Sequence, residues 1–428
     1  MSLSDSAVRH PIYKSRPVEP NPACFGGQRI NDFIILSEAF SNSYLLQTSE
    51  GNIQINAGMG FEAPVIKHNF DEFSKDALRY LILTQGHVDH VGGVAYFREH
   101  NPGLAVIAQA GNAQHQSYDG RLAAFRGNRS AFAFTDKFAS AFEQYARNDY
   151  SDYPAQDAPI ADILVEDRYS FSLGGLTVEV IAVPGAETND SVIVWLPQHK
   201  ICLTGNLFGC PFGHFPNLVT IRGDRYRDAL TVAAAVEVVM DLGAETILYG
   251  HHEPIVGGEL IATELTVLRD AILYVHDETV KGMNAGLDVH TLMADIQLPS
   301  ELEVGEGYGK VSWSVRAIWE NYAGWFKHES TTELYSQPRS VIHEDLIELA
   351  GGPQAIVHRA QLKVGEEKYT EALHLLDIIA AHQRPSSGAV AVAIAAHEGL
   401  LSDSENFWLS SWLKSQIKLL QGTIPESM

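Results

Sequence analysis

Three side chains of the kind that bind metal ions lie close together, directly after an apolar segment. His87, Asp89 and His90 follow the run Arg79–Thr84, and the pair Gly92–Gly93 comes next. Imidazole nitrogens and carboxylate oxygens bind zinc and related divalent ions. On a tight loop, this spacing can direct the side chains at one ion or at two adjacent ions. The motif therefore predicts a metal site, with a polar surface loop as the alternative.

The segments around the motif have the pattern of a mixed α/β domain. Arg79–Thr84 is short and mostly apolar, as expected for a buried strand. Other runs of this kind are Phe33–Leu36, Ser43–Leu46, Asn52–Ile55, Leu104–Ile107, Leu176–Ile181, Val192–Trp195, Ile201–Leu203 and Thr246–Tyr249. Residues 112–158 lack strand patterning and Thr135–Tyr145 looks helical, which predicts a helical insertion near the site. Arg227–Leu242 has apolar residues at helical spacing and ends at Gly243, a typical helix stop.

Strand patterning ends at about Gly258, and helical segments separated by Gly, Pro and Ser follow. They are Glu264–Leu287, Ser312–Trp325, Ile342–Leu349, Glu367–His382, Ala389–Leu401 and Glu405–Leu420. We therefore predict an extended arm over residues 1–30, a mixed α/β domain over 31–258 and an all-helical domain over 259–428.

Composition narrows the class of partner. The 428 residues include 30 Lys and Arg against 53 Asp and Glu, for a formal charge of −23. Such a surface repels polyanions, which excludes nucleic acid as an expected partner and favours a small-molecule substrate. Three cysteines are too few for a disulfide framework and indicate a reducing compartment. No signal-like N-terminus and no membrane span are apparent, so we expect a cytoplasmic protein.

The motifs as a set resemble the metallo-β-lactamase superfamily, and within it the alkylsulfatase branch. Thr84–Gly93 is similar to the signature Thr-His-x-His-x-Asp-His-x-Gly-Gly, with Gln85 in place of the first histidine. Further similar segments are Pro184–Glu187, Pro197–Gln198, Asn217–Gly223, Gly250–Pro254, His276–Thr279, Gly307–Gly309 and Tyr322–Phe326. The resemblance implies an αββα sandwich followed by a helical dimerisation domain, hence a homodimer or higher homo-oligomer. It also implies a chain without the family's sterol-carrier-like C-terminal domain.

The same resemblance implies a ligand set for one or two divalent ions, with zinc as the expected metal. One ion would be held by Gln85, His87 and Glu187, and the other by Asp89, His90 and His251. A neutral glutamine oxygen binds zinc more weakly than imidazole does. The second site is therefore expected to be the tighter. The first is expected to be weak, empty or filled by Mn²⁺ or Fe²⁺.

Two further positions concern the surroundings of the metals. The family has another glutamate that contacts both ions, and the nearest positions here are Gly205 and Asn206, neither of which is a carboxylate. Asn206 and His252 are expected to lie beside the ligands rather than on a metal.

The substrate residues are also implied by resemblance. Arg222 and Arg227 resemble the arginines that hold the sulfate in the family, with surface salt bridging as the alternative. The family's sulfate-facing histidine corresponds to Trp313, an apolar ring with one donor. Trp313 and Phe215 are expected to line an apolar pocket, and Asp89 to orient the attacking water.

Together these features predict a metal-dependent hydrolase that uses metal-activated water on a small or medium organic ester, with alkyl sulfates as one candidate class. The alternatives are the same fold acting on a carboxylic ester, lactone or activated aryl ether, and a degenerate, non-catalytic binding member.

Overall fold

The computed structural model describes residues 20–209, 212–380 and 386–423. These residues form two compact units, one up to Tyr322 and one from Ala323 onward. Most of the predicted N-terminal arm, residues 1–19, lies outside the described residues.

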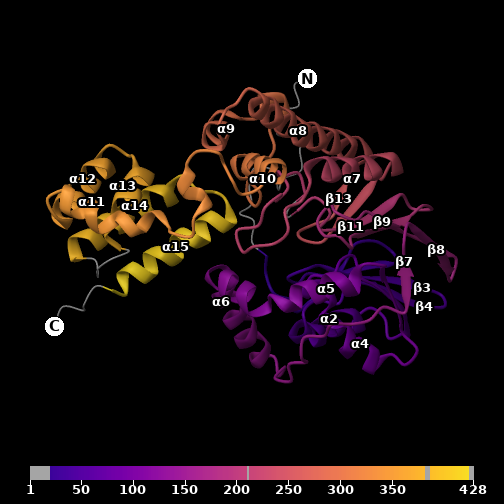
Figure 1. Cartoon of the computed structure of the whole chain (residues 1–428). Coiled ribbons are helices and arrows are strands. Elements are labelled where there is room, and N and C mark those ends of the chain that lie inside the picture. Colours follow the sequence, from indigo (N-terminus) through magenta and orange to yellow (C-terminus); the bar gives the residue numbers. More distant parts are fainter. Residues whose placement is uncertain (1–19, 210–211, 381–385, 424–428) are drawn as a thin grey trace. The chain divides into compact units, whose positions relative to one another are not determined.

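The first unit contains two sheets (Figure 1). The seven-stranded sheet has the order β1-β2-β3-β4-β5-β6-β7. Its strands are β1 (Gln28–Arg29), β2 (Ile34–Ser37), β3 (Ser43–Thr48), β4 (Gly51–Ile55), β5 (Leu78–Ile82), β6 (Ala105–Gln109) and β7 (Ile163–Val165). The first four pair antiparallel, whereas β4 to β7 pair parallel. The parallel part places the loops after β4, β5 and β6 at one edge of the sheet.

The six-stranded sheet has the order β13-β12-β11-β10-β9-β8. Its strands are β8 (Arg168–Leu173), β9 (Leu176–Ala182), β10 (Val192–Leu196), β11 (Ile201–Gly205), β12 (Thr246–Tyr249) and β13 (Ile255–Val256). All pairs are antiparallel except β11 with β12. Both sheets therefore use the β-branched and apolar runs that the sequence presents at these positions.

Helices cover the outer face of each sheet, and a separate apolar core fills the space between the sheets. The inner core includes Ile53, Ile82, Val194 and Leu248. A second core joins the first sheet to α2 (Ala63–Asp71), α4 (Val94–His100) and α6 (Ala123–Arg147). A third joins the second sheet to α7 (Ala229–Leu242), α8 (Gly258–Asn284) and α10 (Val311–Ala323). The layers are those of an αββα sandwich, which confirms the predicted fold class.

The predicted helical insertion is also present, and it is longer than its pattern indicated. It consists of α5 (Asn112–Arg121) and α6, which lie between β6 and β7. The helix predicted over Arg227–Leu242 begins as α7 at Ala229, because Asp228 caps it by accepting a hydrogen bond from the Thr231 amide. It ends at Gly243, whose φ of 62° is left-handed. The short elements of this unit are η1 (Gly60–Glu62), α3 (Val88–Val91), α9 (Val289–Asp295) and η2 (Ser300–Leu302).

The second unit contains helices around an apolar core that includes Ile356, Ala360, Leu376 and Ala396. Its elements are η3 (Thr331–Leu334), η4 (Arg339–Ile342), α11 (His343–Leu349), α12 (Pro353–Gly365), α13 (Tyr369–Ala380), α14 (Ser387–Ser402) and α15 (Phe407–Gln421). The last strand ends at Val256, close to the predicted boundary at 258, but α8 to α10 belong to the first compact unit. Within the described residues, no helix is long and apolar enough to cross a membrane.

Candidate metal centre

The predicted metal-binding turn lies at the carboxyl end of β5. The Thr84 amide and hydroxyl both donate to Asn56 Oδ1 at 3.0 Å, which fixes the chain as it leaves the sheet. His87 then precedes the short helix α3, which carries Asp89 and His90. Since β4, β5 and β6 are parallel, this turn faces the loops at the same sheet edge.

His90 is completely buried among short polar groups. Its Nδ1 lies 3.1 Å from the hydroxyls of Ser41 and Thr84, and its Nε2 lies 3.7 Å from Asp89 Oδ2. Burial lowers the pKa of His90 to about 4, although Asp89 opposes this shift. The ring is therefore neutral at pH 7, which is the form that binds metals.

His251 approaches the same turn from the loop after β12. Hydrogen bonds from Tyr44 to the Tyr249 carbonyl, at 2.6 Å, and from Asn42 to the His252 carbonyl, at 2.9 Å, hold this loop against β3. Burial lowers the pKa of His251 to about 3, while the charge of Asp89 acts in the opposite direction. Asp89 and His90 are thus 3.7 Å apart, and His251 is near enough to feel the charge of Asp89, although the ligand atoms of the three do not all lie within 4.8 Å of one another. His252 also lies near His251.

Asn206 contacts this group, whereas Gly205 leaves no room for a carboxylate. The amide nitrogen of Asn206 lies 3.1 Å from His90 Nε2. Gly205 has a φ of 55°, and a Cβ placed there would lie 2.5 Å from Thr84 Oγ1. A glutamate is therefore incompatible with the backbone at position 205.

His87 contacts other side chains than those around His90. Gln85 contacts His87 through its amide, which lies 2.7 Å from His87 Nδ1. On the opposite side of the ring, His87 Nε2 lies 3.7 Å from Asp224 Oδ2. Burial lowers the pKa of His87, but the interaction with Asp224 outweighs burial and leaves that pKa raised. Gln85 therefore lies behind the histidine ring, where it fixes the orientation of His87.

Glu187 and Arg227, predicted as a metal ligand and a substrate-binding residue, are paired with one another. Arg227 Nη2 donates to Glu187 Oε1 at 2.8 Å, and Arg227 Nε donates to the Glu187 carbonyl at 2.7 Å. Both side chains are almost completely buried. In this arrangement, the arginine charge is satisfied by the protein itself.

The sequence analysis missed two residues of the site, His115 and Asp119 on α5. Of the groups of metal-binding side chains in the described part of the chain, only His87, His115 and Asp119 have ligand atoms that all lie within 4.8 Å of one another. The signal was present as a histidine and an aspartate one helical turn apart, inside the segment predicted to be a helical insertion near the site.

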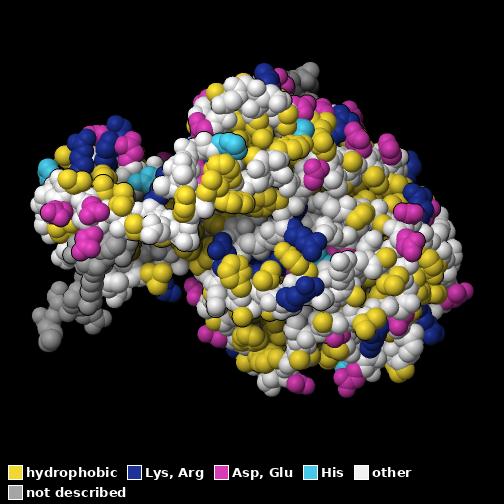
Figure 2. Space-filling model, viewed as in Figure 1, with side chains coloured by type: hydrophobic (Ala, Val, Ile, Leu, Met, Phe, Trp, Pro, Cys, Tyr) yellow, Lys and Arg dark blue, Asp and Glu magenta, His cyan; other side chains and the backbone are white. Residues whose placement is uncertain are grey.

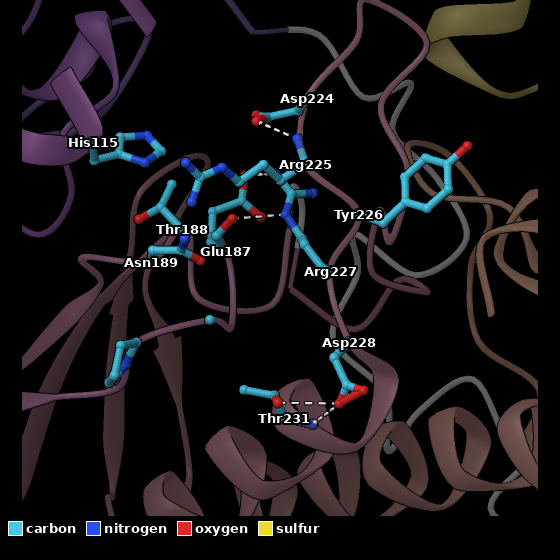
Figure 3. Close-up of a pocket in the computed structure, with 12 residues that line it drawn as sticks. His115, Glu187, Thr188, Asn189, Asp224, Arg225, Tyr226, Arg227, Asp228 and Thr231 are labelled. Carbon is cyan, nitrogen blue, oxygen red and sulfur yellow. Dashed lines mark hydrogen bonds and ion pairs between the residues drawn. The ribbon is translucent and has the colours of Figure 1, made fainter. Parts of the chain in front are cut away.

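A pocket of about 410 Å³ opens beside these residues. His115, Glu187, Asp224, Arg225 and Arg227 belong to its lining. In Figure 3, His115 of α5 points toward the loop residues across the pocket. Figure 2 shows Lys and Arg side chains around a hollow near α5. The pocket lining itself carries both signs of charge, with Glu187, Asp224 and Asp228 beside Arg225 and Arg227.

Arg222, Phe215 and Trp313 complete the predicted set. Among the described residues, the buried Arg222 Nε has no hydrogen-bond partner. Phe215 is 1% exposed and packs in the core beneath the second sheet, together with Phe208 and Phe212. Trp313 lies on α10 and is partly exposed.

Comparison with known families agrees with this architecture. Residues 36–251, just over half of the chain, match the metallo-beta-lactamase superfamily. The chain belongs to that superfamily. Residues 289–422 match the alkyl sulfatase dimerisation domain. The predicted family membership is therefore confirmed.

Individual relatives are alkylsulfatases. The chain is 27% identical over 304 residues to a linear primary-alkylsulfatase of a Pseudomonas species, an alignment that covers 66% of this chain and 56% of the relative. It is 26% identical over 281 residues to an (R)-specific secondary-alkylsulfatase of Pseudomonas, covering 60% of this chain and 41% of the relative. The chain thus spans about half the length of these relatives.

A solved structure shares the fold. The stereoselective inverting sec-alkylsulfatase Pisa1 from Pseudomonas superimposes with a TM-score of 0.79 at 21% identity, over 94% of this chain and 66% of that one.

Proposed function

We propose that this protein is a metal-dependent hydrolase that cleaves an ester of a small or medium organic molecule, with alkyl sulfates as the first candidate class. One observation carries the proposal. Asp89, His90 and His251 interact electrostatically beside His87, and His87 in turn faces Asp224, which lines the pocket. The alkylsulfatase relatives support the choice of substrate class.

The residues present fit a divalent ion. His90 and His251 are neutral at pH 7. Burial alone would raise the pKa of Asp89, but the nearby basic groups, Arg222 among them, outweigh it and leave that pKa lowered, so Asp89 is ionised. We propose that Asp89, His90 and His251 are the ligands of one ion, and that this ion is zinc, as the resemblance to the family implies. For a second ion, the resemblance to the family offers Gln85, His87 and Glu187 as candidate ligands. A bound divalent ion supplies Lewis acidity and lowers the pKa of water to about 7.

The chain's own residues would position the substrate. Arg222 offers its buried, unpartnered Nε to an anionic group, whereas Arg227 contributes by holding Glu187. Asp89 is placed to orient the attacking water. Trp313 and Phe215 are the proposed apolar contacts of the organic group, and for Phe215 this requires movement out of the core.

Esters with less charge are the second candidate class, which covers carboxylic esters, lactones and activated aryl ethers. The pairing of Arg227 with Glu187 favours this class, because it removes one of the two arginines expected to hold a sulfate. The helical domain is proposed to pair two copies of the chain, as the description of its family indicates.

Purified protein can test the proposal directly. The protein, prepared without chelators, is assayed against alkyl sulfates, aryl esters, lactones and aryl ethers, and zinc, manganese and iron are measured on the same batch. We expect a stoichiometric metal and turnover that is lost with EDTA and restored by the metal. Protein without metal and without turnover would indicate a non-catalytic binding member.

A further inference from the structure

Two buried histidine nitrogens near the pocket point at carboxylates without forming hydrogen bonds. Among the described residues, His87 Nε2 and His115 Nε2 have no hydrogen-bond partner, although both side chains are more than nine-tenths buried. His87 Nε2 lies 3.7 Å from Asp224 Oδ2, and His115 Nε2 lies 3.7 Å from Asp119 Oδ2. Unsatisfied buried polar atoms are costly, so the arrangement needs a physical reason.

A shared cation explains these distances. Two ligands of one tetrahedral zinc ion, with bonds of about 2.1 Å, lie about 3.4 Å apart, which is too long for a hydrogen bond. The separation of 3.7 Å between His115 Nε2 and Asp119 Oδ2 is close to that value. The equal distance from His87 Nε2 to Asp224 Oδ2 places Asp224 as a further neighbour of the same ion. The group His87, His115 and Asp119 offers two imidazoles and one carboxylate within 4.8 Å of one another.

We propose that His87, His115 and Asp119 form a divalent metal site in which two residues of α5 take the place of Gln85 and Glu187. The inference rests on the proposed metal dependence and changes which residues hold the second ion. Two imidazoles and a carboxylate suit zinc, iron(II) or manganese(II) and leave coordination positions open for water or substrate.

The outer contacts of both histidines place Nε2 on the side of the proposed site. The Gln85 amide lies 2.7 Å from His87 Nδ1, and with its oxygen turned to that nitrogen it would accept from Nδ1–H and leave Nε2 for the ion. The buried Asp190 carboxylate lies 3.9 Å from His115 Nδ1, beyond hydrogen-bond distance but on the side opposite Nε2. Asp190 is itself held by Asn112, whose amide donates to Asp190 Oδ2 at 2.7 Å.

Arg126 orients two of the carboxylates near the proposed site, those of Asp119 and Asp224. Its two terminal nitrogens pair with Asp119 Oδ1 and with Asp224 Oδ1, the latter at 3.0 Å. The other oxygen of each aspartate is thereby left to face a histidine. Asp224 Oδ2 thus remains beside the proposed ion as an additional acceptor.

The residues implied by the family are less suited to hold this ion. Glu187 Oε1 is engaged by Arg227 at 2.8 Å, and Gln85 lies on the Nδ1 side of His87. Freeing Glu187 would leave the buried Arg227 charge without its partner, which is unfavourable. The ligand atoms of His87, His115 and Asp119 lie within 4.8 Å of one another and would close to about 3.4 Å around the ion, with no buried ion pair broken.

Metal binding by matched variants tests the inference. Wild type, His115→Ala, Asp119→Asn and Glu187→Gln are loaded with Zn²⁺, desalted and analysed for zinc, and their zinc affinity is titrated. Gln116→Ala is the control for α5, because that side chain bonds Asn112 and the Pro159 carbonyl but no member of the group. Loss of an outer contact alone weakens metal sites by about 10–100-fold. We therefore expect a loss of at least about 100-fold for His115→Ala and Asp119→Asn, and wild-type zinc for Glu187→Gln and Gln116→Ala.

Wild-type zinc content and affinity in folded Asp119→Asn would overturn the inference, as would loss of zinc in Glu187→Gln alone. If His115→Ala does not fold, Asp119→Asn decides, since its amide oxygen can still accept from Arg126. The proposed function is tested separately. If the α5 variants lose zinc but the wild-type protein hydrolyses none of the esters, the proposed site is supported and the proposed function is overturned. If the protein hydrolyses an ester and the α5 variants keep wild-type zinc, the proposed function is supported and the proposed site is overturned.

Discussion

His90 and His87 belong to one short turn, yet their surroundings are of opposite kinds. His90 contacts two hydroxyls and an amide, and burial keeps its ring neutral. His87 faces Asp224, whose carboxylate raises the pKa of the imidazole. The groups around His90 come from loops at the ends of strands, whereas those around His87 include an inserted helix. The sheet topology thus sets one half of the site, and an insertion sets the other.

The largest expected loss of metal and activity follows from changes at His90 and His251, which belong to the half of the site set by the sheet topology. His90→Ala and His251→Ala should each remove the metal at this site and turnover together, because each leaves the set of Asp89, His90 and His251 with a single imidazole. The loss should exceed the 10–100-fold typical of an outer contact. His397→Gln, in the second unit, is the control. Turnover retained in both alanine variants would show that His90 and His251 are not needed for catalysis.

The next largest expected effect is the loss of stability when Arg227 is replaced. Arg227→Met should lower the free energy of unfolding by about 3–5 kcal/mol, because the buried Glu187 carboxylate loses its partner. Urea denaturation at pH 7 measures the change. The double variant Arg227→Met/Glu187→Gln should recover most of it. A stable single variant would show that the pair is not a structural unit.

Arg222 is expected to act on substrate instead of stability. Arg222→Ala should weaken an anionic substrate by about 2–3 kcal/mol, as expected for a lost charge-assisted hydrogen bond. The ratio kcat/KM for an alkyl sulfate and for a neutral ester of the same chain length gives the measurement. Equal losses on both substrates would argue against a role in anion binding.

Gln85 tests whether the first motif position orients a histidine. Gln85→Leu should weaken zinc binding by about tenfold, since His87 Nδ1 loses its partner while its Nε2 is unchanged. Zinc titration measures the affinity. A complete loss of one equivalent of zinc would instead identify Gln85 as a ligand.

The smallest effect is on pH dependence in the metal-free protein. The lowered pKa of His90, about 4, favours the folded state above pH 6.5, and this contribution is lost as pH falls toward 4. The raised pKa of His87 favours the folded state below pH 6.5 and is lost as pH rises through that pKa. Either slope is at most about 1.4 kcal/mol per pH unit. Unfolding free energies of His90→Asn and His87→Asn should therefore change relative to wild type in opposite directions as pH falls from 7 to 5.5, and changes of the same sign would contradict the comparison.

The sequence predicted the parts of the molecule that depend on local pattern. Short apolar runs predicted nine of the thirteen strands in the described residues, and missed β1, β7, β8 and β13. The His87–His90 motif, with its resemblance to a family, predicted the sandwich. The contacts of His115 and Asp119 depend on where α5 packs, which neither helical periodicity nor motif spacing encodes. The same holds for Glu187, because a sequence does not reveal that Arg227 folds back onto it.

The left-handed glycine at position 205 limits what can be engineered at this edge of the site. A glutamate introduced there would adopt a conformation suited to glycine, with its Cβ against the hydroxyl of Thr84. Placing a carboxylate at this position would therefore require Thr84 and the end of β11 to change first.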